Sequence, residues 1–284
     1  MTLDRSTIHL SDRKRRFVDL CIEEGPREGF KRFVEFSIKR VAFIAFLEPI
    51  RIPIVRWRQK IGHATSPLRY SDADPFKIIY VDPSNVTQQQ QYLSTDDIVC
   101  FDDTRRFHKW ENVGKVAEGD WDLYTSSLLD HPRYQVLIER FVEGKSWEET
   151  DYIQEVMADV KDGNRRWNSC TSVNDVAERC KMLDELYDSM QREGYQRQHA
   201  TSLYRWRDEY DLLTLNIDRK GEFIRNNSGG HRLIIAKILG IERIPARVLL
   251  RHRDWQSLRN QIRAGSIEFA TEHPDLADIV KSDE

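Results

Sequence analysis

The pattern of hydrophobic and polar positions is clearest in the last third of the chain. Residues Leu212–Ile217 are rich in β-forming side chains, and Asp218–Gly221 is a cluster of turn-forming residues. A strand that ends in such a turn predicts a hairpin, whose second strand would be Glu222–Arg225.

A helix and a last strand are predicted after this hairpin. Apolar residues recur at helical spacing from Leu233 to Leu239, and Gly240 is a good C-terminal glycine for a helix. Pro245 would open the last strand, at a position where its missing N–H does least harm. We expect the fold to be organised around this order of strand, glycine turn, helix and strand.

The rest of the pattern alternates between the two kinds of element and predicts an α+β fold. Ala177–Gly194 places its apolar residues on one face of a helix, and Ser146 with Glu149 three residues later is typical of a capped helix start. The other predicted elements are strands at Asp96–Phe101 and Gly114–Val116, helices at Pro132–Glu143, at Trp147–Asp162 and from Trp255 to about Ala264, a linker at Ala64–Pro75, and a loop or strand exit at Thr87–Gln91.

The two adjacent glycines at the start of the predicted helix carry the candidate chemistry. Gly229 and Gly230 would let the backbone approach a ligand closely, and the unpaired N–H groups of a first helical turn attract an anion. His231 and Arg232 would add side-chain donors next to them. The alternative interpretation is that the glycines only form a turn, with His231 and Arg232 capping neighbouring carbonyl groups.

A family resemblance favours the anion site. The stretch from Gly229-Gly230-His231-Arg232 through Gly240 to Ile244-Pro245 resembles the ParB/sulfiredoxin superfamily, whose members bind nucleotide phosphates at the start of this helix. Lys77–Ser84 is similar to the family's first strand and its Asp-Pro exit, and Ser189–Gly194 is similar to the end of a family helix. The resemblance covers residues 76–84 and 175–253, about a third of the chain.

The chain also departs from each known branch of that superfamily. Sulfiredoxins carry a cysteine before the histidine, whereas Gly230 is followed directly by His231. Partition proteins usually read Gly-Glu-Arg-Arg at this turn and continue into a helix-turn-helix domain. The free serine kinases read Asp-Gly-His-His-Arg, which is closer to Ser228–Arg232 but has one more acidic residue and one more histidine. The resemblance therefore implies a nucleotide-binding domain, with phosphotransferase or NTPase activity using ATP or CTP as one form of it.

The resemblance also implies a division of the chain. Residues 67–264 would form the ParB/sulfiredoxin-like domain, with a mixed sheet, helices and an insertion at about 92–174. This insertion holds four of the seven tryptophans, which favours a packed lid. Residues 1–66 would be a basic amphipathic helical extension, and residues 265–284 an acidic tail that frays from Glu272 onward.

Phosphoryl transfer would require further residues around the glycines. Ser228, Gly229, Gly230, His231 and Arg232 would hold the phosphates of a nucleoside triphosphate, while Arg225 and Arg232 offset developing negative charge.

Acidic residues would provide the magnesium site and the base. The carboxylates of Asp120 and Asp122 are candidates for binding Mg²⁺, and Asp120, Asp122, Glu222 and His231 are the candidate catalytic residues for a small-molecule acceptor. Gly119–Asp122 has an alternative interpretation as a turn with Trp121 in a local core.

Charge is distributed unevenly along the chain. Residues 1–64 contain 14 Lys and Arg against 8 Asp and Glu, whereas the whole chain has a net charge of −3. Residues 30–58 combine this basic charge with phenylalanines at helical spacing and Trp57, which suits a helix lying on a membrane surface. Packing against the chain's own domain or a second subunit of a homodimer, and binding to nucleic acid, are the alternatives.

The remaining features restrict the class of protein. The four cysteines form no Cys-x-x-Cys pair, and Met1–Leu10 has no apolar signal region. We therefore expect a cytoplasmic protein with reduced thiols, and the membrane-surface interpretation of residues 30–58 would place it at the inner membrane face. A DNA-binding module of partition type is less favoured than a nucleotide-binding one, because the chain is acidic outside residues 1–64 and shows no reading helix.

Overall fold

The computed structural model describes residues 52–91, 113–164, 167, 170–195, 212–226, 228–267 and 272–279. The chain divides into two compact units, Met1–Ile54 and Val55–Glu284, and apart from residues 52–54 the described residues belong to the second unit. Two sequence predictions lie outside the described residues. They are the strand at Asp96–Phe101 and residues 1–51 of the basic extension.

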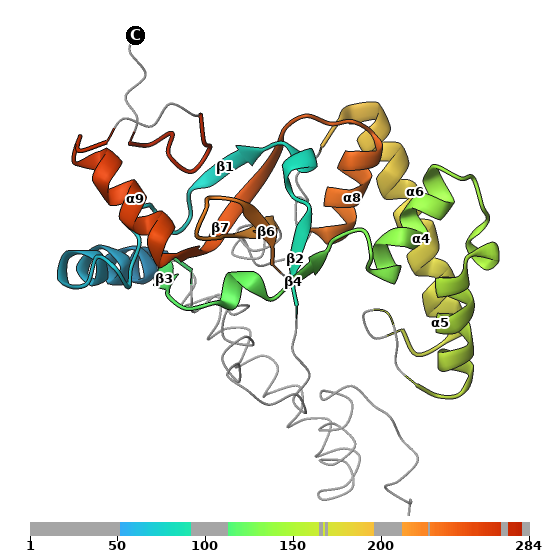
Figure 1. Ribbon diagram of the computed structural model, residues 1–284. Coiled ribbons are helices and arrows are strands. Elements are labelled where there is room, and N and C mark those ends of the chain that lie inside the picture. The colour runs from blue at the N-terminus through green and yellow to red at the C-terminus, as the bar shows by residue number, and fades with distance from the viewer. Residues whose placement is uncertain are drawn as a thin grey trace, which may run out of the picture. The chain divides into compact units, whose positions relative to one another are not determined.

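Seven strands form one mixed sheet in the described part of the chain, in the order β1-β7-β5-β6-β2-β4, with β3 also paired to β7 (Figure 1). β1 runs antiparallel to the first half of β7, and β3 runs parallel to its second half. The strands are β1 (Ile78–Val81), β2 (Gln88–Gln90), β3 (Lys115–Ala117), β4 (Thr125–Ser127), β5 (Leu213–Ile217), β6 (Phe223–Arg225) and β7 (Ile244–His252).

The glycine turn and its flanking elements are confirmed by the structure. β5 and β6 form the expected antiparallel hairpin, with Ile217 opposite Phe223. Helix α8 (Gly230–Ile238) follows, and Gly240 ends it with a φ of 66°. All residues of β5 and of β7 are buried, because these central strands are covered on both faces. The coarse α+β class is therefore shown.

The helices α4, α5, α6, α8 and α9 form two groups, one around α8 and the other at α9 (Figure 1). Around α8, which contacts β5, lie α4 (Pro132–Phe141), α5 (Asp151–Lys161) and α6 (Val173–Glu193), while α9 (Arg253–Arg263) packs on β7 and β3. Other helical elements are the helix of residues 52–65 and three short 3-10 helices, η1 (Pro83–Asn85), η3 (Trp121–Leu123) and η4 (Trp147–Glu149). Aromatic and aliphatic side chains from α4, α5, α6 and α8 share one core with the sheet.

Two predicted elements need correction. The single helix expected at Trp147–Asp162 is divided into η4 and α5, because Thr150 between them has extended backbone angles. The polar run Thr87–Gln91, expected to be a loop or strand exit, contains β2, which pairs with β4 on one side and β6 on the other. Backbone hydrogen bonds from two neighbours outweigh the low β-propensity of glutamine in this strand.

The predicted linker at Ala64–Pro75 is packed rather than extended. Residues 52–65 are helical, and Ser71 and the side chain of Asp72, which follow this helix, are fully buried. The Asp72 carboxylate accepts a 2.7 Å hydrogen bond from Arg259 Nε of α9. Side-chain hydrogen bonding therefore draws this polar segment into the fold.

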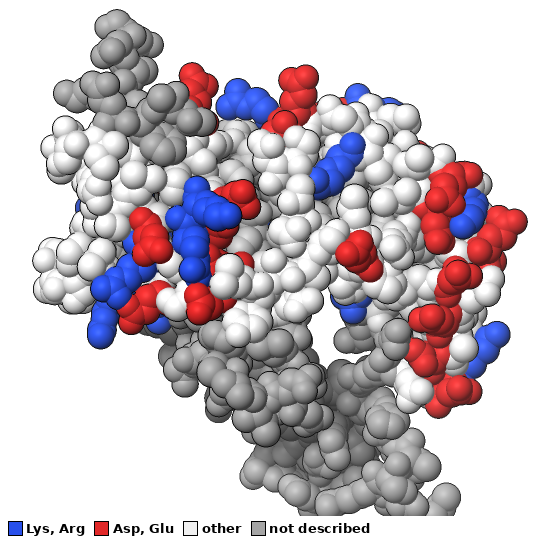
Figure 2. Space-filling model, viewed as in Figure 1, with Lys and Arg blue, Asp and Glu red and all other residues white. Residues whose placement is uncertain are grey.

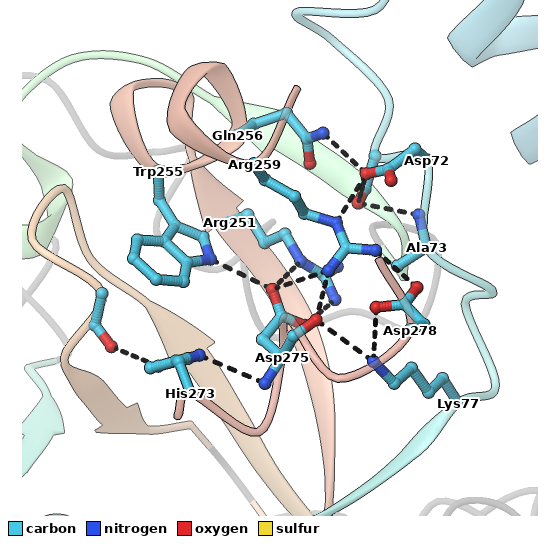
Figure 3. A network of polar contacts seen from close by, with 12 residues as sticks. Asp72, Ala73, Lys77, Arg251, Trp255, Gln256, Arg259, His273, Asp275 and Asp278 are labelled. Carbon is cyan, nitrogen blue, oxygen red and sulfur yellow. Dashed lines mark hydrogen bonds and ion pairs between the residues drawn. The ribbon is translucent and has the colours of Figure 1, made fainter. Parts of the chain in front are cut away.

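The C-terminal segment 272–279 is also docked, although the sequence predicted a fraying tail. Asp275 and Leu276 are buried, and the Asp275 carboxylate accepts hydrogen bonds from Arg251 Nε (2.9 Å) and Trp255 Nε1 (3.0 Å). Figure 3 shows this network, in which the side chain of Arg259 lies between Asp72, Asp275 and Asp278. Composition alone gave the wrong prediction, because these carboxylates pair with arginines from distant strands and helices.

Acid should weaken this network. Burial alone would raise the pKa of Asp72, but the hydrogen bond and charge of Arg259 outweigh burial and lower this pKa to about 2. A carboxylate with a depressed folded-state pKa contributes stability that is complete above its unfolded pKa and is lost as the pH falls through its folded pKa. We expect a loss of about 2 kcal/mol from this group between pH 5 and pH 2.

Urea unfolding followed by circular dichroism across this pH range would measure that loss. Asp72→Asn should be less stable at pH 7 and should show a flatter dependence of unfolding free energy on pH. The same dependence in wild type and variant would contradict the assignment.

Candidate functional site

A cavity of about 520 Å³ lies where strands β2, β4 and β6 meet the N-termini of helices α4 and α8. Its lining is polar, and several of its side chains are hydrogen-bond donors. The lining residues are Gln89, Gln90, Gln91, Ser126, His131, Arg133, Tyr134, Arg225, Ser228, Gly229, Gly230 and His231.

The glycine turn is held against strand β5 by Ser228. The Ser228 hydroxyl donates to the Leu212 carbonyl oxygen at 2.6 Å, and the Ser228 N–H donates to Thr214 Oγ1 at 3.2 Å. Gly229 then takes a φ of 77°, and a Cβ there would lie 2.7 Å from Leu213 Cα. Only glycine tolerates both the positive φ and the close contact with Leu213, which explains why position 229 is a glycine.

Gly230 is the first residue of α8 and faces other side chains. A Cβ on Gly230 would lie 2.7 Å from Arg225 Nη2 and would also meet the Tyr134 hydroxyl. The Arg225 guanidinium lies 5.1 Å from the centre of the Tyr134 ring and donates to Gln89 Oε1 at 3.3 Å. The missing side chain at Gly230 therefore lets two polar groups approach the helix N-terminus.

The N-terminus of α8 has backbone donors to offer. Its N-cap residue, Gly229, has no side chain to accept hydrogen bonds from the first turn. Among the described residues, no hydrogen bond is made by the backbone N–H groups of Gly230 and His231. Unpaired amides and the helix dipole favour an anion at such a position.

A second helix begins at the same cavity. His131 is the N-cap of α4, and its Nδ1 accepts a hydrogen bond from the Arg133 N–H at 3.2 Å. Because Nδ1 is an acceptor, the neutral ring carries its proton on Nε2. Burial lowers the pKa of His131, and the charges of Arg133 and Arg225 lower it further.

The electrostatic field in the cavity is positive. Burial lowers the pKa of His231 to about 3, and the neighbouring arginines Arg179, Arg225, Arg133 and Arg232 add to this effect. The His231 Nε2 atom is buried and has no hydrogen-bond partner among the described residues. Both histidines are therefore neutral near pH 7, and the arginines carry the charge. Since the described lining contains no Asp or Glu, an anion fits this cavity better than a cation.

Three candidate carboxylates lie away from this cavity. Glu222 stands in the turn at the opposite end of β6 from Arg225, where its N–H donates to Asp218 Oδ1. Asp122 is buried and accepts hydrogen bonds of 2.7 and 2.6 Å from Arg219, which also binds Asp120 at 2.8 Å. The structure thus places these residues at the far end of the β5–β6 hairpin and not with the glycine turn.

The proposed magnesium ligands have another role in the fold. Burial alone would raise the pKa of Asp122, but its hydrogen bonds with Arg219 lower it. Trp121, between the two aspartates, is fully buried in a small core with Ile224 and Leu250. Within the described residues, no group of three or more His, Cys, Asp or Glu is arranged to hold a metal ion. These features match the alternative interpretation of a turn with a buried tryptophan.

Arg232 is in the first turn of α8 but does not line the cavity, so its influence there is electrostatic.

The sequence interpretation omitted the contributions of α4, β2 and β4, namely His131, Arg133, Tyr134, Gln89, Gln90, Gln91 and Ser126. The local signal for this part of the site was Pro132, since proline is common at the first position of a helix.

Comparisons with protein-family models, curated proteins and solved structures found no match to this chain.

Proposed function

We propose that this cavity binds the phosphate groups of a small molecule, with a nucleotide as the favoured class. The observation that carries the proposal is the convergence of the first-turn amides of α8, the positive end of the α4 dipole and two arginines on one cavity whose described lining has no carboxylate. Phosphate oxygens accept hydrogen bonds from backbone amides and from guanidinium groups, which are the donors present here. The resemblance of the glycine turn to the ParB/sulfiredoxin superfamily supports the same ligand class.

The proposal concerns binding rather than phosphoryl transfer. Transfer would need a carboxylate to hold Mg²⁺ and a base near the acceptor hydroxyl. Asp120, Asp122 and Glu222 were the candidates for these roles, and they lie at the other end of the hairpin. The donor set of the cavity therefore fits phosphate oxygens but offers no described carboxylate to a magnesium ion.

DNA is a poorer fit than a small ligand. Figure 2 shows acidic side chains along the α4 and α5 side of the molecule, where Glu143, Glu148, Glu149, Asp151 and Glu155 are exposed. A surface that binds DNA would present several Lys or Arg side chains to the phosphates instead. Arg133 and Arg225, which line the cavity, suit one compact anion.

Isothermal titration calorimetry with ATP, CTP, GTP and pyrophosphate, with and without Mg²⁺, would test the proposal. Wild type should bind at least one of these, and Arg133→Gln and Arg225→Gln should each weaken that binding by about tenfold or more. The matched control is Arg243→Gln, since Arg243 is exposed at the far end of α8, against Tyr80. Absence of binding by wild type, or equal loss in the control, would reject the phosphate site.

A further inference from the structure

The helix of residues 52–65 turns its apolar residues outward. Trp57 and Ile61, one helical turn apart, are 66% and 44% exposed, and Ala64 follows at the next turn, also exposed. Ile54, which precedes Trp57 by three residues, is 55% exposed. A helix that packs on a domain normally buries such residues. We call Trp57, Ile61 and Ala64 the outer face of this helix.

The helix is attached to the fold through its other side. Gln59 is buried and its Nε2 donates to the Ser71 carbonyl oxygen, while His63 Nδ1 lies 2.9 Å from the Tyr70 carbonyl oxygen. Gly62 is buried directly against the Tyr70 ring, where a Cβ would not fit. The face with Gln59, Gly62 and His63 therefore makes the described packing contacts, and the outer face lies on the opposite side of the helix.

The charges along the helix are all positive. Residues 52–65 contain Arg56, Arg58 and Lys60 and no Asp or Glu. Arg56 pairs with Asp74 at 2.9 Å. At 100° per residue, Arg58 and Lys60 border the outer face on opposite sides. An exposed apolar strip with cations on both edges matches the headgroup region of a bilayer that contains anionic lipid.

We propose that this outer face binds the surface of a bilayer containing anionic lipid. Tryptophan favours the boundary between lipid and water, which explains the large exposure of Trp57. A second copy of the chain fits less well, because a two-fold contact would bring the cationic edges together. Among the described residues, no helix is long and apolar enough to cross a membrane, so the contact proposed is with the surface.

Flotation of the full chain with vesicles tests the proposal. Wild type should float with vesicles of 70% phosphatidylcholine and 30% phosphatidylglycerol and should float much less with pure phosphatidylcholine, and 0.5 M NaCl should reduce binding. Trp57→Ser combined with Ile61→Ser should lower the bound fraction by about fivefold or more, and Lys60→Glu should also lower it. Leu123→Ser and Met182→Ser remove exposed apolar residues elsewhere and should leave binding unchanged.

Two results would overturn this assignment. Equal flotation of wild type and the Trp57/Ile61 double variant would show that this helix is not the lipid-binding element. A concentration-dependent dimer that the double variant loses, without any flotation of wild type, would show that the outer face is a protein interface. Since neither measurement involves the cavity, both are independent of nucleotide binding.

Discussion

Asp275→Ala is expected to lower the free energy of unfolding by at least about 3 kcal/mol, because removing one partner of a buried ion pair leaves the other charge uncompensated. The carboxylate is fully buried and binds Arg251 through both oxygens, at 2.9 Å and 2.5 Å. It also accepts from Trp255 Nε1 at 3.0 Å and lies 3.7 Å from Arg259 Nη1. The alanine variant would leave Arg251, itself buried, without this partner.

Urea unfolding at pH 7, followed by tryptophan fluorescence, would measure this loss. Asp254→Ala is the matched control, since Asp254 is mostly exposed at the start of α9 and should change stability by less than about 0.5 kcal/mol. Asp278→Ala should lie between the two, because Asp278 is about one-third exposed but binds Arg259 and Lys77. A loss below about 1 kcal/mol for Asp275→Ala would show that the C-terminal segment is not needed for stability.

Arginines occupy two kinds of environment in the described part of this chain. Arg251 and Arg259 are paired with aspartates and hold segments together. Arg133 and Arg225 line the cavity, where the described lining contains no acidic group. Neutral groups help to position both of these side chains: Arg133 donates to the Tyr152 hydroxyl at 3.3 Å, and Arg225 donates to Gln89 Oε1 at 3.3 Å.

The sequence predicted what depends on neighbouring residues. The β5–β6 hairpin, α8 and its terminal Gly240 each follow from turn residues and apolar spacing within a short stretch. The backbone half of the candidate site was therefore accessible, since Gly229 and Gly230 start α8 and line the cavity.

The side-chain half was not accessible, because it comes from distant parts of the chain. His131 and Arg133 are about 100 residues from His231 and meet it only because α4 packs against α8. The prediction that Glu222 belongs to the site failed for the opposite reason. It is close to the glycines in sequence, but the extended strand β6 carries it about 10 Å away from Arg225.

Strand β2 shows a third limit of sequence patterns. Three consecutive glutamines have no hydrophobic alternation, so nothing local indicates a strand. In the fold, Gln89 and Gln90 are buried, and Gln90 Nε2 donates to the Trp121 carbonyl oxygen at 2.8 Å. Their side chains obtain partners from η3 and β6, which no window of sequence contains.

Gly230→Ala is expected to weaken ligand binding in the cavity by at least about tenfold while leaving the chain folded. Gly230 has a negative φ within α8, so its backbone accepts alanine. The added methyl group would meet the Arg225 guanidinium and the Tyr134 hydroxyl. The Arg225 guanidinium is the end of a flexible side chain and can move away, whereas the buried Tyr134 ring has to shift within the core. We expect a loss of at least about tenfold in affinity for pyrophosphate or the best-binding nucleotide, and a loss of stability of about 1–2 kcal/mol.

Gly229→Ala should differ from Gly230→Ala in that its main effect is a loss of stability. At Gly229 a methyl group would lie 2.7 Å from Leu213 Cα, which is backbone, and the φ of 77° disfavours alanine. Gly229→Ala should therefore lose about 2–4 kcal/mol of stability, whereas Gly240→Ala, with a similar φ but open space, should lose about 1 kcal/mol. Titration calorimetry and urea unfolding of all three variants would measure both quantities. If Gly230→Ala bound the ligand as tightly as wild type, the ligand would not lie at the start of α8.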